Sequence, residues 1–195
     1  MDISEVKTAF KIADVEFVEG QTKLNFKYLT DLKDENGNRL DKKILTINVS
    51  RVYLIVVDGA IKKIGASGSK GGMKNTLQIY QDGGIKGRPS IRSYGVWYFL
   101  YHTILQGKKI EFYMIYQDNF EADVKGLFGK KKREASLNPK LIEECCLEDY
   151  LEREKGVYPE WNLQEQGSDW PNEAKDAHAD ILKESAKRSR KKVVS

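Results

Sequence analysis

The sequence lacks the features that mark membrane, secreted and zinc-binding proteins. No apolar run in its 195 residues approaches the roughly 20 that a membrane-spanning helix needs. The amino end carries no basic segment followed by an apolar one, so we expect no signal peptide. The only two cysteines, Cys145 and Cys146, are adjacent, which is unsuited to a disulfide, and no histidine cluster stands near them to complete a zinc site. These absences predict a reducing, cytoplasmic compartment and no membrane partner.

The charges that are present are distributed unevenly along the chain. The net charge is only +4, but Lys130, Lys131, Lys132 and Arg133 form one basic block. A second block at the carboxyl end comprises Lys183, Lys187, Arg188, Arg190, Lys191 and Lys192. Such blocks suit phosphate backbones, and the alternative is a solvated loop and a disordered tail. For the carboxyl-terminal block alone, that alternative is slightly favoured.

Alternation of apolar and polar residues predicts strands in the first part of the chain. Two alternating runs between residues 10 and 30 are separated by Gly20-Gln21 and predict a β-hairpin. A turn at 34–38 precedes a further expected strand at 44–49.

A second hairpin is predicted to turn at Asp58-Gly59. A two-residue turn would pair Tyr53 with Ile64 and would put Lys63 on the opposite face. A three-residue loop with Gly59 in the left-handed conformation would pair Tyr53 with Lys63 directly. We prefer the second register because Asp-Gly fits a type I turn followed by a bulge, although the sequence alone does not decide between them.

Helical signals dominate the remainder of the chain. The expected elements are a short helix at 73–80, a loop at 82–92, a helix at 96–106, a strand at 110–116, a helix at 138–155, an irregular segment at 157–171 and a polar helix at 172–188. Asn138 and Pro139 suit the start of the third helix, Gly156 suits its end, and Trp161 and Trp170 are expected to anchor the irregular segment.

These elements predict an α+β fold, in which a small antiparallel sheet is flanked by helices and extended by an amino-terminal hairpin and a carboxyl-terminal helix. We divide the chain into an amino-terminal β-rich extension at 1–48, a core at 49–156 and a carboxyl-terminal extension with a basic tail at 157–195.

Glu143 is the most informative carboxylate. On the helix at 138–155 it shares a stripe with Leu147 and Tyr150, which should face inward, whereas Glu144 and Glu148 should face solvent. An acid on a semi-apolar stripe needs a partner or a metal, because an unpaired buried charge is costly. On helix geometry alone, an ion pair with Lys or Arg is the favoured interpretation.

Two short motifs resemble the signature of the GIY-YIG nucleases. They are Val52-Tyr53 and Lys63-Ile64-Gly65, and a short hairpin separates them. The resemblance is greater to the small type II restriction enzymes of that superfamily, in which a lysine occupies the first position of the second motif. Before the resemblance is considered, Tyr53 would be interpreted as a core residue and Lys63 as a solvated strand residue.

The resemblance extends over about residues 51–152. Tyr80 falls where that branch has a helical tyrosine, and Trp97-Tyr98-Phe99 is similar to its aromatic helix start. Leu127-Phe128-Gly129-Lys130 resembles a motif 13 residues before the metal-binding glutamate of the branch, and this spacing reaches Glu143.

The resemblance implies a GIY-YIG-like catalytic core and a sequence-specific, metal-dependent DNA endonuclease of prokaryotic or phage origin. Glu143 would bind one Mg²⁺ or Mn²⁺ per active site, and Tyr53 would be the general base. Because a free tyrosine has a pKa of about 10, an adjacent Lys63 ammonium would be needed to lower it. Tyr80 would hold the phosphate or the water.

The chain departs from the family pattern at several positions. Arg51 replaces the usual first glycine, Ala66 stands where the branch has a histidine, and Thr76 stands at the offset of the family's helix arginine. The candidates to supply the missing charge are Lys74, Arg88 and Arg92. Of these, Lys74 is assigned to the catalytic set, and Arg88 and Arg92 join Lys130, Lys131, Lys132 and Arg133 in the expected DNA-binding set.

The expected partners are double-stranded DNA and a second copy of the chain, because restriction enzymes usually cut palindromic sites as symmetric dimers. The alternatives are a catalytically inactive DNA-binding protein with this fold, a homing or repair nuclease, and a basic scaffold in which Tyr53 is core and Glu143 an ion pair. Metal-dependent nicking and salt-sensitive DNA binding discriminate among them.

Overall fold

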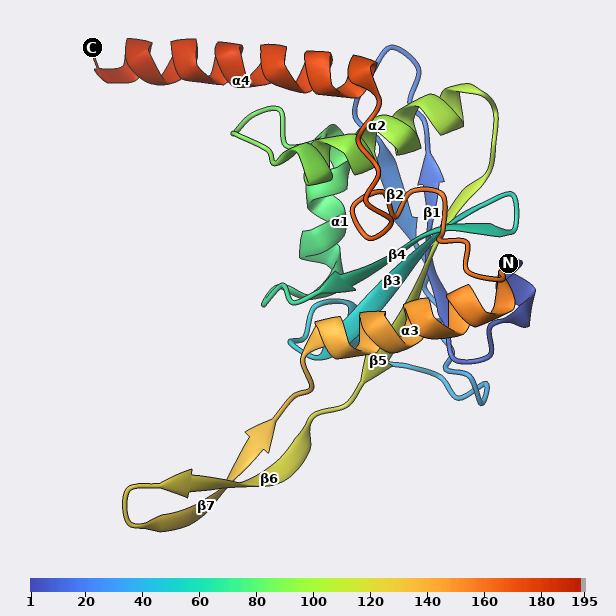
Figure 1. The fold of residues 1–195 in the computed structure, drawn as a ribbon, viewed down its shortest axis with the longest axis vertical. Coiled ribbons are helices and arrows are strands. Elements are labelled where there is room, and N and C mark those ends of the chain that lie inside the picture. Colours follow the sequence, from blue (N-terminus) through green and yellow to red (C-terminus); the bar gives the residue numbers. More distant parts are fainter. Residues whose placement is uncertain (194–195) are drawn as a thin grey trace.

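The structure is a computed structural model that describes the backbone of residues 1–193 and the side chains of residues 1–187. A central antiparallel sheet separates two layers of helices, with α1 and α2 on one face and α3 on the other (Figure 1). The strand order is β2-β1-β5-β3-β4. The strands are β1 (Phe10–Glu16), β2 (Asn25–Tyr28), β3 (Ser50–Val57), β4 (Ala60–Ser67) and β5 (Ile110–Gln117). The helices are α1 (Gly72–Asp82), α2 (Ile91–Leu105), α3 (Pro139–Arg153) and α4 (Asn172–Val193), with 3-10 turns η1 (Ile3–Glu5) and η2 (Lys42–Leu45).

The expected α+β fold is confirmed. The amino-terminal hairpin exists as β1 and β2, and β1 pairs with β5, so the hairpin belongs to the same sheet as the expected core. Helix α3 also follows the expectation, because the Asn138 side chain accepts a hydrogen bond from the Lys140 N–H and Pro139 occupies the first turn. Trp161 and Trp170 are buried against Phe99, which confirms them as anchors.

Three expectations about local structure are wrong. The segment at 44–49 is not a strand, because η2 turns there and buries Ile44 and Leu45. Helix α2 begins at Ile91, well before residue 96, because the Ser90 side chain accepts a hydrogen bond from the Ser93 N–H and caps it. The carboxyl-terminal basic block, for which a disordered tail was slightly favoured, continues α4 as far as Val193.

The β3–β4 hairpin adopts neither expected register. Asp58 and Gly59 both have positive φ, at 48° and 86°, and form a two-residue turn that pairs Val57 with Ala60. A bulge then shifts the register between Ile55 and Val56, so that Tyr53 pairs with Gly65 and Ile55 pairs with Lys63. Since residues two apart on a strand share a face, Tyr53 and Lys63 lie on the same face in diagonal positions.

The alternation of side chains along β3 divides the core in two. Tyr53, Ile55 and Val57 face α1 and α2 and join the larger apolar cluster. Val52, Leu54 and Val56 face α3 and the amino-terminal segment. Every residue of β3 is buried, as expected for a strand covered on both faces.

Residues 120–135 form a separate two-stranded ribbon of β6 (Phe120–Gly126) and β7 (Gly129–Ala135). The ribbon leaves the sheet after β5, returns to the start of α3 and projects from the body of the molecule (Figure 1). These strands were not predicted from the sequence, in which only a basic block, with a solvated loop as its alternative, was apparent there. Among the described residues, no helix is long and apolar enough to cross a membrane.

Candidate active site

A buried tyrosine pair lies at the centre of the site. Tyr53 on β3 and Tyr80 on α1 are both buried, and their phenol oxygens lie 2.7 Å apart, so one hydroxyl donates to the other. The ring of Tyr53 lies against Gly65 on β4, where an added Cβ would be 2.5 Å from both the Tyr53 Cζ and Oη atoms. Gly65 is therefore required by the position of the Tyr53 ring.

Burial makes both phenols poor acids in this structure. Loss of solvation raises the pKa of Tyr53 well above its usual value, and the neighbouring Tyr80 raises it further. The pKa of Tyr80 is also raised by burial. The guanidinium of Arg92 acts in the opposite direction on both tyrosines, whereas the Glu143 carboxylate raises both pKa values. Lys63, which was expected to lower the pKa of Tyr53, is not among the groups that shift it here, whereas Arg92 is.

Glu143 is held on the inward side of α3, with Leu147 and Tyr150 beneath it and Glu144 and Glu148 exposed. The helix-stripe prediction is thus confirmed. Its Oε1 atom accepts a hydrogen bond of 2.8 Å from the Ala66 N–H, a backbone group at the edge of β4 that no strand pairs with.

Two cations complete the surroundings of the Glu143 carboxylate. Arg92 on α2 lies 3.8 Å from Oε1, and the Lys140 ammonium contacts Oε2 from one helical turn before. The Arg92 guanidinium also lies 3.4 Å from the Glu165 carboxylate. Arg92 thus bridges two acids beside the tyrosine pair, whereas the sequence indicated it only as one of several candidate cations.

Lys63 is buried on the same sheet face as Tyr53, and its ammonium donates a hydrogen bond of 3.4 Å to the Trp161 carbonyl. Burial lowers the pKa of Lys63 to about 8, with Glu165 acting in the opposite direction. The segment that supplies Trp161 also covers the edge of β4. The Asn162 amide accepts from the Ile64 N–H and donates to the Ile64 carbonyl, each at 2.8 Å.

Two departures from the family motifs meet in space. The buried guanidinium of Arg51 donates to the carbonyls of Ile47 and Val49 at 2.8 Å and to the Ser67 hydroxyl at 3.3 Å. The Ser67 hydroxyl is in turn 2.6 Å from that of Thr76 on α1. Arg51 therefore ties the ends of β3 and β4 to α1, and its guanidinium is committed to protein oxygens.

The remaining candidates lie elsewhere. The Lys74 ammonium lies 5.1 Å from the ring centroid of Tyr28, on the strand at the opposite edge of the sheet from β4. The structure does not bring Lys74 together with Tyr53 and Glu143. Arg88 is exposed in the loop before α2, and the basic block at 130–133 lies on β7.

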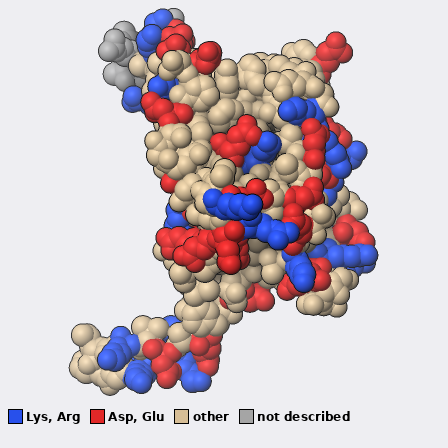
Figure 2. Space-filling model, turned by 45° about the vertical axis from the view of Figure 1, so that its right-hand side comes forward, with Lys and Arg blue, Asp and Glu red and all other residues tan. Residues whose placement is uncertain are grey.

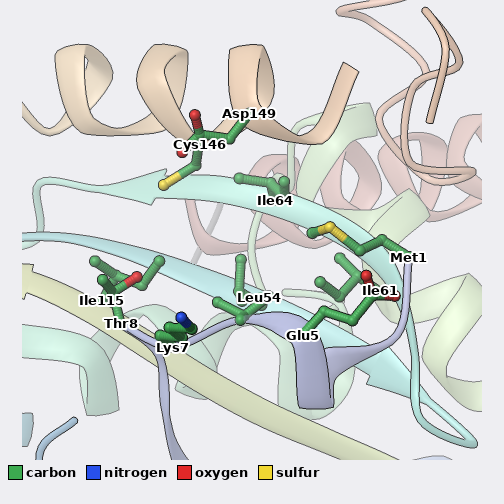
Figure 3. A pocket seen from close by; sticks show the side chains of 11 residues that line it. Met1, Glu5, Lys7, Thr8, Leu54, Ile61, Ile64, Ile115, Cys146 and Asp149 are labelled. Atoms are coloured by element: carbon green, nitrogen blue, oxygen red, sulfur yellow. The ribbon is translucent and has the colours of Figure 1, made fainter. Parts of the chain in front are cut away.

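A pocket of about 260 Å³ lies on the α3 side of the sheet and does not contain the tyrosine pair. Met1 and Thr8 line it from the amino-terminal segment, and Leu54 and Ile64 line it from the sheet (Figure 3). The lining is mainly apolar, and the chemistry-bearing side chains described above lie outside it.

The donor set suits a hard divalent cation bound mainly by water. Among the described residues, no group of three or more His, Cys, Asp or Glu side chains could hold a metal. Mg²⁺ commonly binds through one or two carboxylates and keeps several waters. Glu143 is the carboxylate that could bind such an ion, because Lys140, the cation on its Oε2 atom, has a half-exposed side chain that can turn toward solvent.

Comparisons with known proteins identify the fold. No family model and no curated protein matches the chain. The structure of a mutant of bacteriophage T4 EndoII is similar over 83% of this chain and 98% of that chain, with a TM-score of 0.50 and 14% identity. Restriction endonuclease HPY188I in complex with product DNA matches over 82% and 84%, with a TM-score of 0.46 and 21% identity. The chain has the fold of the EndoII structure.

The sequence indicated Arg92 without singling it out, and Asn162, Glu165 and Lys140 were not predicted as parts of this site. Arg92 was only one of several candidate cations, because the helix cap at Ser90 was not predicted. Without that cap, the position of Arg92 on the first turn of α2 could not be inferred. Asn162 and Glu165 lie in a segment without periodicity, and no local signal shows that it covers an edge strand. The position of Lys140, three residues before Glu143 on α3, was the one detectable signal, because side chains at that spacing are neighbours on a helix.

Proposed function

We propose that the chain is a metal-dependent DNA endonuclease of the GIY-YIG type. The observation that carries the proposal is the convergence of Tyr53, Tyr80 and Glu143 from a strand and two helices, with Arg92 close enough to influence both phenols. These are the positions to which the motif resemblance assigned the chemistry. EndoII, whose fold the chain shares, is a DNA endonuclease, and this supports the same class of substrate.

The proposed chemistry is hydrolysis of a phosphodiester bond. Mg²⁺ or Mn²⁺ on Glu143 would supply positive charge to the phosphate as negative charge develops on it. The Tyr53 phenol first releases its proton to solvent, and the phenolate then accepts the proton of the attacking water. The water oxygen bonds to phosphorus as the bond from phosphorus to the leaving oxygen breaks, and that oxygen takes a proton from solvent. Tyr80 holds the Tyr53 oxygen in place through their 2.7 Å hydrogen bond.

Arg92 is the cation best placed to assist this reaction. Its guanidinium is partly exposed beside Glu143, so it can contact a phosphate while it favours the phenolate form of Tyr53. It thereby takes the role for which the family uses a helix arginine. Arg51 does not suit that role, because its guanidinium is fully buried and bound to protein oxygens.

Within this class we favour a restriction-type enzyme that recognises a short sequence in double-stranded DNA and acts as a homodimer. A palindromic site cut on both strands calls for two active centres related by symmetry. The alternative is a catalytically silent DNA-binding module. The observation that supports this alternative is that ion pairs occupy both Glu143 oxygens.

Plasmid nicking in Mg²⁺ tests the proposal. The parental chain should nick or linearise DNA that carries its site, and a plasmid pool of random inserts supplies that site. Glu143→Ala should abolish cleavage and leave DNA binding largely intact. Glu144→Ala changes an exposed neighbour on the same helix and should cut at the parental rate. Binding without cleavage by the parental chain in Mg²⁺ or Mn²⁺ would leave the silent module as the correct function.

A further inference from the structure

The β6–β7 ribbon is built to reach outward. Each strand has 7 residues, and at about 3.3 Å per residue the ribbon extends roughly 20 Å from the sheet. Its base is fixed beside the candidate active site, because the Ser50 hydroxyl at the start of β3 donates to the Leu137 carbonyl. Glu143 follows on the second turn of the helix that begins there.

The tip of the ribbon exposes two large apolar side chains. Leu127 is 95% exposed and Phe128 is 100% exposed, at the turn between β6 and β7. Burying a side chain of this size gains about 1.5–3 kcal/mol, so full exposure of an adjacent pair at the end of a projecting element marks a contact surface.

Positive charge surrounds this apolar tip. Between residues 125 and 133 there are five cations and no acid. The cations are Lys125, Lys130, Lys131, Lys132 and Arg133. The acids of the ribbon, Glu121, Asp123 and Glu134, lie in the half nearer its base, together with Arg133 and with Lys132, which pairs with Glu121. Figure 2 shows the basic side chains along the ribbon at the lower left.

The two faces of the ribbon also differ. Strand pairing puts Val124 opposite Lys131 and Ala122 opposite Arg133, so this face combines apolar and basic side chains. The other face carries Lys125 opposite Lys130, Asp123 opposite Lys132 and Glu121 opposite Glu134, so it mixes acids with cations. The first face has no acid among its paired residues, and it is therefore the face suited to a polyanion.

We propose that the β6–β7 ribbon enters a groove of duplex DNA and inserts Leu127 and Phe128 as a wedge between base pairs. The inference rests on the proposed DNA substrate, and it adds a second site outside the catalytic centre. A two-stranded ribbon fits the major groove, which is about 8.5 Å deep, and apolar wedges that unstack a base step are known from proteins that bind the minor groove. The basic face would follow the phosphates while the tip reaches the bases.

The surrounding charge favours DNA over a second copy of the chain as the occupant. A contact between two such tips would bring six cations together without an acid, because Lys125, Lys130 and Lys131 are the charged residues that lie beyond the Asp123–Lys132 pair on each ribbon. Like charges in proximity oppose association, whereas phosphates compensate them.

A linking-number measurement tests the wedge without any cleavage. Closed circular plasmid is relaxed in EDTA by a topoisomerase that needs no divalent metal, with saturating protein present. A wedge that unstacks base pairs unwinds the duplex, so the purified plasmid should be negatively supercoiled after exposure to the parental chain. Leu127→Ala/Phe128→Ala should lose most of this shift and keep the parental melting temperature. Leu105→Ala/Val157→Ala, which truncates exposed apolar side chains elsewhere, should keep the shift.

The basic block at 130–133, whose residues alternate between the two faces, has its own variant. Replacement of Lys130, Lys131, Lys132 and Arg133 by Gln should weaken DNA binding and reduce the salt slope by about 0.9 for each phosphate that the protein no longer neutralises. An unchanged salt slope would show that the block is only solvated. A tip variant that shifts the linking number as much as the parental chain does would overturn the wedge. A tip variant whose mass in solution without DNA differs from the parental mass would also overturn it, since the tip would then hold a second copy.

These outcomes are separate from those of the proposed endonuclease. If the parental chain unwinds plasmid but does not nick it in Mg²⁺, the wedge stands and the proposed endonuclease is wrong. If the parental chain nicks plasmid, and the tip variant and its control shift the linking number equally, the proposed endonuclease stands and the wedge is wrong. A chain that binds no DNA overturns both.

Discussion

The hydroxyls of Tyr53 and Tyr80 share a single buried hydrogen bond of 2.7 Å, and either oxygen can be its donor. When Tyr53 accepts from Tyr80, the bond favours the Tyr53 phenolate, because hydrogen bonds to the charged form stabilise it. When Tyr53 donates, the bond favours its neutral form. The pair can therefore adopt two hydrogen-bond arrangements, one of which favours the Tyr53 phenolate, without movement of either ring.

Tyr53→Phe should reduce the cleavage rate by about 10²–10⁴-fold, the usual cost of losing a positioned general base. Tyr80→Phe should reduce it less, because the base remains and only its partner is lost. Single-turnover cleavage rates measure the effect, with melting temperatures as the check on folding. Each variant leaves one buried hydroxyl without its partner, at a cost to stability of about 1–3 kcal/mol. Parental cleavage by Tyr53→Phe would show that the residue only fills the core.

Arg92→Gln should slow cleavage by about 10²-fold, on the scale of losing one preorganised group that stabilises charge in the transition state. It should also move the rate profile to higher pH, because Arg92 lowers the pKa of Tyr53. Rates from about pH 6 to pH 10 follow the rise of the phenolate fraction below the pKa of Tyr53 and measure both effects. Arg88→Gln removes an exposed arginine from the preceding loop and is the control. Equal effects of the two substitutions would indicate general DNA attraction instead of a local role.

The inward position of Glu143 could be predicted because helical periodicity is a local property. The stripe of Glu143, Leu147 and Tyr150 needs only a spacing of three to four residues, and all three are buried as expected. The cap at Asn138 is equally local. The position of the metal-ligand candidate on its helix was therefore accessible from the sequence, and the resemblance then gave it a role.

The register of the β3–β4 hairpin was not accessible in the same way. Its turn is local, but the bulge between Ile55 and Val56 has no sequence signal of its own. The bulge keeps Tyr53 and Lys63 on one face and places Gly65, not Lys63, opposite the tyrosine. The cover that Asn162 provides for β4 joins residues 98 apart in the chain, which no periodicity can indicate. The β6–β7 ribbon was missed because its strands are polar and pair only with each other.

Gly65→Ala should destabilise the fold by about 1–3 kcal/mol, the typical cost of overpacking a core. The new Cβ would lie 2.5 Å from the Tyr53 ring, and that ring is confined by Tyr80 and Phe112. Urea unfolding measures the loss. In a Tyr53→Ala background the same substitution should cost less, since the obstructing ring is gone. Gly68→Ala is the control, because its Cβ would meet only Pro139 at 3.9 Å. Additive costs in the double variant would contradict the contact.

Lys63→Met should stabilise the protein near neutral pH, because it removes a buried ammonium whose desolvation opposes folding. The pKa of Lys63 falls from 10.5 to about 8 on folding, so the native state binds fewer protons than the unfolded state between these values. Below pH 8 the lysine is charged in both states and the cost is fully present. As the pH rises from 8 toward 10.5, the parental chain gains stability and should approach the variant.

The measurement is the free energy of unfolding in urea at intervals from pH 7 to pH 10.5. Lys62→Met is the matched control, because Lys62 lies next along β4 and forms an ion pair with the exposed Glu160. Exposed pairs contribute about 0–1 kcal/mol, and this control should show no convergence near pH 8. A difference between Lys63→Met and the parental chain that stays constant with pH would contradict the shifted pKa. If Lys63 contributes to catalysis, Lys63→Met should be more stable than the parental chain and should also cleave DNA more slowly. Residues that act in a reaction often lower the stability of the fold.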